Sequence, residues 1–188
     1  MNKNKTLIIK ISLTIGLITM AVIWRIINHD NNFAPNLELI TLATVLASVI
    51  VGMRASIIVP ITSMIISDLI IGNSSIFIFT WGAFGLIGLG AILLRKLNNR
   101  PKKQILYSVG FVVISSFTFF LITNFGVWAQ GWYPPTFAGL MTSYELAIPF
   151  YRTMLIGNLI LVPVAVLVFQ TVRSKIESKN LVINPSIS

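Results

Sequence analysis

Stretches of mostly apolar residues, separated by short polar or basic segments, dominate the sequence. A helix needs about 20 mostly apolar residues to cross a bilayer, and most of these stretches reach or approach that length. The pattern predicts six transmembrane helices, over about residues 7–27, 37–51, 55–71, 76–94, 105–128 and 153–172. The expected fold class is therefore all-α, with a six-transmembrane-helix bundle that forms a single membrane domain over residues 1–188.

Residues 129–151 differ from the other connections between the predicted helices. They hold three prolines, one charged residue and many aromatic side chains, whereas a solvated linker is polar and rich in Gly and Ser. We expect this segment to pack as a re-entrant or covering loop over the outer end of the bundle. At the C-terminus, residues 180–188 are expected to form a frayed tail.

The amino-acid composition supports a membrane protein. Hydrophobic residues make up 55% of the chain and charged residues only 10%, against about 25% charged residues in ordinary soluble domains. The net charge of +9 would favour nucleic acid as the partner of a soluble protein. Because the basic residues lie between apolar segments here, we expect a lipid bilayer as the surroundings and no nucleic acid.

The distribution of Lys and Arg predicts the orientation of the bundle. Cytoplasmic loops of membrane proteins carry an excess of basic residues. With the N-terminus inside, only Arg25 and Arg152 fall outside the cytoplasmic segments. The other basic residues all fall inside: Lys3, Lys5, Lys10, Arg54, Arg95, Lys96, Arg100, Lys102, Lys103, Arg173, Lys175 and Lys179. We therefore expect a multi-pass protein of the bacterial cytoplasmic membrane with both termini in the cytoplasm.

Several kinds of chemistry have no support in the sequence. The chain has no cysteine and one histidine, which excludes disulfides, thiolate metal sites and a multi-His metal centre from this chain alone. It has no phosphate-binding loop, no His-Glu-x-x-His motif and no Gly-x-Ser-x-Gly elbow. We expect neither a metal nor a cofactor, and no enzymatic activity.

Asp68 lies near the outer end of the third predicted helix. A carboxylate at membrane depth is costly, so it needs a partner or a water-filled cavity. One interpretation is a ligand or ion contact at the outer mouth of the bundle. The alternative is a helix-end residue at headgroup level that is tied to the backbone or to Arg152.

Asn124 and Trp128 stand four residues apart on the fifth predicted helix and therefore share a face. Phe117 and Phe120 continue this stripe toward the membrane interior. An amide above an aromatic wall would suit a ring-bearing small molecule, because a few polar groups orient a ligand in an apolar pocket. The alternative is structural, with Trp128 in the interfacial belt and Asn124 hydrogen-bonded between helices.

Arg152 begins the sixth predicted helix, where the positive end of the helix would add to its charge and favour a bound anion. Tyr151 and Asn158, seven residues apart, align on one face of that helix. Together with Asn124, Arg152 predicts a small organic ligand with an anionic or polar end. Alternatively, Arg152 only pairs with Asp68 or Glu145.

A series of short motifs between about Asn32 and Gly157 resembles a bacterial family of uncharacterised membrane proteins. That family is similar to the substrate-binding S components of energy-coupling-factor (ECF) transporters. The motifs are Asn32-Phe-x-Pro35, Ser67-Asp68…Gly72, Asn124-Phe-Gly-Val-Trp128, Tyr133-Pro134, Gly139-Leu140 and Pro149-Phe150-x-Arg152…Gly157.

The resemblance implies an uptake protein that binds a vitamin-like or other micronutrient near the outer face. The implied substrate-binding residues are Asn32, Asp68, Asn124, Trp128, Tyr133, Tyr144, Arg152 and Asn158. It also implies docking onto a transmembrane coupling subunit that two ATPase subunits drive. Ser12 and Gly16 on the first helix would take part in this docking, in place of the family's Ala-x-x-x-Ala.

A non-catalytic accessory or assembly subunit of a larger membrane complex is the alternative function. Such a subunit would fill the region around Asn124, Trp128 and Arg152 with side chains and leave no cavity there. The presence or absence of an outer pocket therefore discriminates between the two functions.

Overall fold

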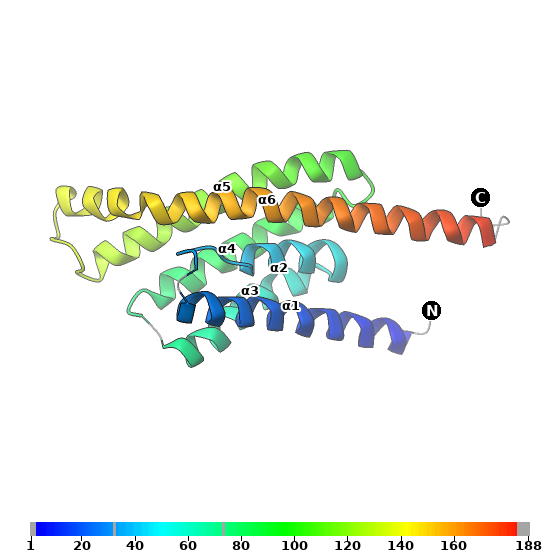
Figure 1. Ribbon diagram of the computed structural model, residues 1–188, viewed down its shortest axis with the longest axis horizontal. Helices are drawn as coiled ribbons and strands as arrows, with labels where there is room; N and C mark the ends of the chain where they lie inside the picture. The colour runs from blue at the N-terminus through cyan, green and yellow to red at the C-terminus, as the bar shows by residue number, and fades with distance from the viewer. Residues whose placement is uncertain (1–2, 32, 73, 184–188) are drawn as a thin grey trace.

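The computed structural model describes residues 3–31, 33–72 and 74–183, and these residues form helices and connections without strands (Figure 1). Among these described residues, five helices are long and apolar enough to cross a membrane, which indicates a membrane protein. In chain order the helices are α1 (Lys3–Asn31), α2 (Ile40–Leu46) continued by the π-helical turn η1 (Ala47–Val51), α3 (Met53–Ile71), α4 (Phe77–Arg95), α5 (Pro101–Ala129) and α6 (Phe137–Ile183).

The second helix is shorter than the predicted span over residues 37–51. Together α2 and η1 cover Ile40–Val51, about 18 Å at 1.5 Å per residue, against a hydrocarbon core of about 30 Å. Nearly all their side chains are buried. Some of these side chains pack in an apolar cluster with residues of α1, α3 and α4, and others pack in a second cluster with residues of α4, α5 and α6. The segment is apolar because it forms the core of the bundle.

Local conformation sets the bounds of this short helix. Asn36 has a φ of 63° shortly before α2 begins, and Gly52 adopts a φ of 152° between η1 and α3. Residues other than glycine rarely adopt such a φ, so Gly52 permits the sharp reversal. The carbonyl groups of Ser48 and Val49 in η1 accept hydrogen bonds from Arg95 Nη1 at 2.9 Å and Asn98 Nδ2 at 2.8 Å. These side chains satisfy backbone acceptors that a helix end leaves free.

Helix α6 corrects the prediction of a covering loop over residues 129–151 and of a sixth helix that begins at residue 153. Only residues 130–136 connect α5 to α6, and α6 includes Pro149 and Pro163. Thr136 precedes the helix, and its Oγ1 accepts a hydrogen bond from the N–H of Gly139 at 3.1 Å, an N-terminal cap. Prolines are tolerated within membrane helices because neighbouring groups satisfy the freed carbonyls. At the other end, α6 continues to Ile183, past the start of the predicted frayed tail.

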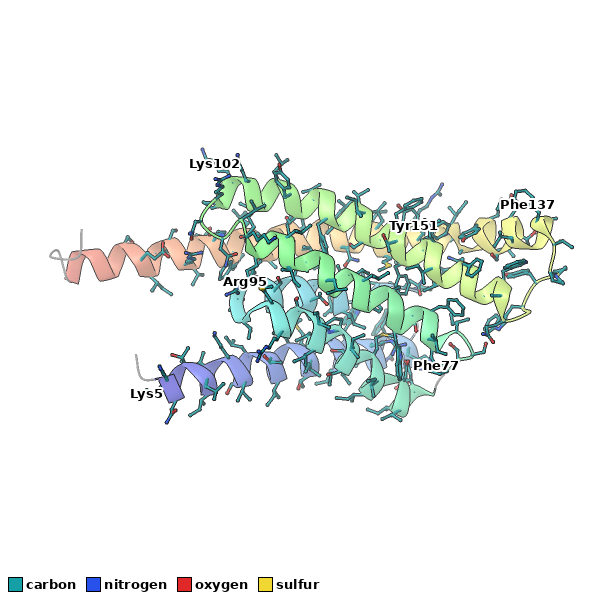
Figure 2. The ribbon with its side chains drawn as sticks, turned by 180° about the vertical axis from the view of Figure 1, so that it is seen from behind. Lys5, Phe77, Arg95, Lys102, Phe137 and Tyr151 are labelled. Atoms are coloured by element: carbon teal, nitrogen blue, oxygen red, sulfur yellow. The ribbon has the colours of Figure 1, made fainter. Side chains whose placement is uncertain are left out.

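Apart from Arg25 and Arg152, the basic residues belong to segments at one end of the bundle. Figure 2 shows Lys5, Arg95 and Lys102 at the end where α1 begins and α6 ends, and Phe77 and Phe137 at the opposite end. We call these the basic end and the aromatic end. This separation agrees with the asymmetric distribution of Lys and Arg along the sequence, which predicts the orientation of the chain.

Candidate functional site

A cavity of about 620 Å³ lies in the aromatic half of the bundle. Helices α1, α3, α4, α5 and α6 all contribute to its walls, together with residues from the connections between them. Its lining residues are Arg25, Asn28, His29, Pro35, Asn36, Leu37, Glu38, Met64, Ile71, Ser74, Ile76, Thr80, Phe84, Phe119, Phe120, Thr123, Asn124, Val127, Trp132, Tyr133, Ser143, Leu146, Ala147, Phe150, Tyr151 and Met154.

Aromatic side chains of α5 and α6 form one wall of the cavity. The rings of Phe120 and Tyr151 lie 4.9 Å apart between their centroids, and those of Phe120 and Tyr144 lie 5.4 Å apart. Tyr151, labelled in Figure 2, is in the same half of the molecule as Phe77 and Phe137. Tyr144 itself does not line the cavity, and its hydroxyl donates to the carbonyl of Leu121 at 3.0 Å. Tyr144 therefore ties α6 to α5 behind the wall.

Of the predicted pair on the fifth helix, Asn124 lines the cavity and Trp128 does not. The Nδ2 of Asn124 donates to the carbonyl of Phe120 at 2.7 Å, within the same helix. The Nε1 of Trp128 donates to the carbonyl of Pro134 at 3.1 Å and so holds the connection to α6. The structure thus places the amide at the cavity and the indole beside the turn.

Asp68 is buried and does not line the cavity. Its carboxylate accepts a hydrogen bond from Arg25 of α1 and another from the Nε1 of Trp81 at 2.7 Å. Arg25 also donates to Ser67, the neighbour of Asp68. The structural alternative expected the backbone or Arg152 as the partner of Asp68, and the structure shows Arg25 of helix α1 instead.

Arg152 is exposed and lies outside the cavity lining. Because α6 begins at Phe137, Arg152 stands well inside the helix, and the argument from the positive end of a helix does not hold for it. Within the described part of the chain, Arg152 forms no ion pair with Asp68 or Glu145. Neither of the two roles expected for Arg152 is visible in this geometry.

Asn158 is fully buried and hydrogen-bonded to Glu38, which is not among the predicted site residues. Its Nδ2 donates to Glu38 Oε1 at 2.9 Å, and the N–H of Thr41 donates to Glu38 Oε2 at 2.8 Å. Glu38 lines the cavity from the connection before α2. Burial raises the pKa of the Glu38 carboxyl, and the hydrogen bonds from Thr41 and Asn158 oppose this rise.

Side chains of α1 also hold the connection that carries Glu38. The Nδ2 of Asn28 donates to the carbonyls of Ala34 at 2.9 Å and Leu37 at 3.0 Å, and Trp24 Nε1 donates to the carbonyl of Leu37 at 2.9 Å. The Oδ1 of Asn28 accepts from the N–H of Ala34 at 3.1 Å. These bonds fix the backbone beside Glu38 against α1 and place its carboxylate at the cavity.

The remaining predicted residues lie in separate places. Tyr133 lines the cavity, and Asn32 lies outside the described residues. Ser12 and Gly16 are exposed on α1 and do not line the cavity. The structure therefore brings Asn124 and Tyr133 together at the cavity, and it keeps the two small residues of α1 on a free helix face.

The residues missed by sequence reasoning had partial signals. Glu38 falls within the first turn of the predicted helix over residues 37–51, where an acidic charge suits the helix dipole, and this position alone indicates no cavity. Arg25 was one of two basic residues outside the cytoplasmic segments, which in retrospect pointed to an acidic partner at the same membrane level. Asn28 gave no signal beyond its place in an Asn-rich stretch.

Comparison with known proteins identifies a family, but the activity of that family is unknown. No curated protein and no solved structure matches this chain. A family model does match over residues 5–181, and its description is a family of unknown function, DUF6580. The expectation of an uncharacterised family is thereby confirmed. The match covers nearly the whole chain, and the protein therefore belongs to the DUF6580 family.

Proposed function

We propose that this DUF6580 protein is a small-molecule-binding membrane subunit that serves uptake across the bacterial cytoplasmic membrane. The cavity of about 620 Å³ carries the proposal. Ligand pockets measure about 300–1,000 Å³ and combine apolar and aromatic walls with a few polar groups. This cavity has that composition, since Phe119, Phe120 and Tyr151 line it together with Asn124 and Glu38.

The orientation of the bundle favours a ligand that arrives from outside the cell. The cavity lies in the half of the molecule opposite the basic end, and an excess of basic residues is typical of the cytoplasmic side. With α2 and η1 counted as a short embedded span, both termini would lie in the cytoplasm. The cavity would then face the outer side of the membrane.

Uptake against a gradient needs a source of energy that this chain lacks. The sequence has no phosphate-binding loop, so ATP hydrolysis would come from other subunits. The resemblance to ECF S components suggests how these subunits would bind. A transmembrane coupling subunit, which carries the ATPase subunits, would dock on the first helix. The exposed Ser12 and Gly16 fit such a contact, because small residues let helices approach closely.

An accessory or assembly subunit is the competing function. A subunit that only packs against partners has no need for an internal cavity, and its side chains would fill the region around Asn124. The volume beside Asn124 favours a ligand-binding protein over that alternative.

Native mass spectrometry of the full chain, purified from its own membrane in mild detergent, tests the proposal. We expect a co-purified small molecule bound to the protein, and transmembrane and ATPase subunits in the same preparation. A protein that repeatedly carries partner subunits but no small molecule would support the accessory role instead.

A further inference from the structure

Glu38 presents a carboxylate at the cavity with a fixed orientation. Each of its oxygens accepts one hydrogen bond, from Thr41 N–H and from Asn158 Nδ2. The Thr41 hydroxyl and the Ile40 N–H also interact with this carboxyl group, so all of its protein partners are uncharged donors. These interactions orient the group at the cavity wall, and none of them supplies a positive charge.

Among the described residues, no cationic side chain forms an ion pair with the Glu38 carboxylate at the cavity. Arg25 lines the cavity and is paired with Asp68, and His29 is paired with Asp30. Within the part of the chain that the structure describes, Glu38 has no ion pair, and it is the only acidic residue that lines the cavity. A partly buried carboxylate without a counter-charge is costly, and a cationic ligand would remove that cost.

Aromatic rings line the same cavity. Phe84, Phe119, Phe120, Trp132, Tyr133 and Tyr151 all contribute to its walls. The faces of such rings attract cations as well as apolar groups. Aromatic walls around one uncompensated carboxylate suit a ligand that has an apolar or aromatic body and a positively charged nitrogen.

We propose that Glu38 is the ligand-binding carboxylate of this cavity and that the ligand is an organic cation carrying a protonated amine or similar N–H donor. This inference rests on the proposed small-molecule binding and adds to it the charge class of the ligand. It reverses the anionic end expected from Arg152, which lies outside the cavity. Asn158 and Thr41 act as positioning residues that hold the carboxylate toward the ligand.

A charge series of probes with one ring system tests this assignment. The probes are tryptamine, which is cationic, indole-3-acetamide, which is neutral, and indole-3-propionate, which is anionic. Binding to the detergent-purified full chain is measured by calorimetry for the wild type, Glu38→Gln and the control Glu145→Gln. Glu145 is exposed on α6 and outside the cavity lining, so its substitution removes the same charge elsewhere.

We expect the wild type and Glu145→Gln to prefer tryptamine over both other probes. Loss of the charge-assisted contact in Glu38→Gln should weaken tryptamine binding at least about tenfold and leave indole-3-acetamide unchanged. Glu38→Asp keeps the charge and should keep the preference for the cation. This second variant distinguishes loss of the charge from a loss of folding in Glu38→Gln.

The outcomes separate this inference from the function on which it rests. Equal binding of tryptamine by Glu38→Gln and the wild type, or a preference of the wild type for the neutral or anionic probe, would overturn the role of Glu38 and leave small-molecule binding intact. Absence of binding by the wild type to every probe, together with no co-purified molecule, would overturn both.

Discussion

Two acidic side chains in the aromatic half of the bundle are held in different ways. Asp68 is buried against a guanidinium and an indole, whereas Glu38 accepts only uncharged donors and borders the cavity. A buried carboxylate that is paired has a structural role, because removing its partner leaves an uncompensated buried charge and destabilises the folded protein. An unpaired carboxylate at a cavity wall costs stability in the empty protein and is available to a ligand.

Arg25→Met tests the first of these roles. The substitution keeps an apolar side chain against α3 but leaves the Asp68 carboxylate without its cation, so we expect the free energy of unfolding to fall by about 3 kcal/mol. Arg152→Met is the matched control, because Arg152 is exposed and has no ion pair in the described structure. Thermal unfolding in detergent measures both. Equal melting temperatures for the two variants would refute the structural role of Arg25.

The raised pKa of Glu38 predicts how stability depends on pH. The folded protein keeps the Glu38 proton to a higher pH than the unfolded chain, whose ordinary value is 4.5. Binding of this proton therefore adds to the free energy of unfolding at low pH, and this contribution is lost as the pH rises through the raised pKa. Glu38→Gln mimics the protonated form, so the ligand-free variant should melt a few degrees above the wild type near neutral pH, and the two should converge as pH falls.

Thermal unfolding of both proteins from about pH 4 to about pH 8 measures this difference. Charged groups near Glu38 come from α1, which places Arg25 and His29 at the same cavity, while α6 contributes the uncharged Asn158. Subtracting the two curves removes the contributions of the titratable groups that both proteins share. A variant less stable than the wild type at every pH would mean that the carboxylate stabilises the empty protein.

For single residues, the sequence could indicate which side chains need an interaction partner, but not which residue is that partner. Asp68 was expected to need a partner, and it has one in Arg25, which lies 43 positions earlier in the chain. No local pattern reveals which helices face each other, so Arg152 was an equally reasonable choice. Glu38 was missed because its role depends on a cavity that only the packing of five helices creates.

Among the helices, those with uninterrupted apolar sequences were predicted well. The bounds of α3 and α4 differ from the prediction by one or two residues, because short turns with Gly or basic residues end the apolar runs. The predicted start of the sixth helix, residue 153, is far too late, because Pro149 and the aromatic residues before it are typical of a loop as well as of this helix. The helix start is encoded by Thr136, a side chain suited to capping, which directly follows two prolines.

Removal of that cap tests the start of α6. Thr136→Ala deletes the acceptor for the Gly139 N–H and should destabilise the first turn of α6 by about 1 kcal/mol. Thr142→Ala is the control, since the Thr142 hydroxyl bonds only within its own helix, to the carbonyl of Ala138 at 2.9 Å. Faster hydrogen exchange near residues 137–140 in Thr136→Ala alone is expected. Unchanged exchange would contradict a helix that begins at Phe137.

For the whole molecule, the proposed orientation follows from the separation of the basic and aromatic ends. The chain has no native cysteine, so a single introduced cysteine reports on one place without background. Ala138 and Ser174 are exposed near opposite ends of the same helix, α6. A membrane-impermeant maleimide should label Ala138→Cys in intact cells and Ser174→Cys only after permeabilisation. The reverse pattern would place the cavity on the cytoplasmic side.

The central claim is that the cavity holds a small molecule, and filling the cavity tests it most directly. Ala147 lines the cavity, whereas Ala138, on the same helix, is exposed and does not. Native mass spectrometry should detect the co-purified molecule on the wild type and on Ala138→Trp but not on Ala147→Trp, with all three proteins folded. The same molecule retained by Ala147→Trp, or no molecule on the wild type, would contradict the account.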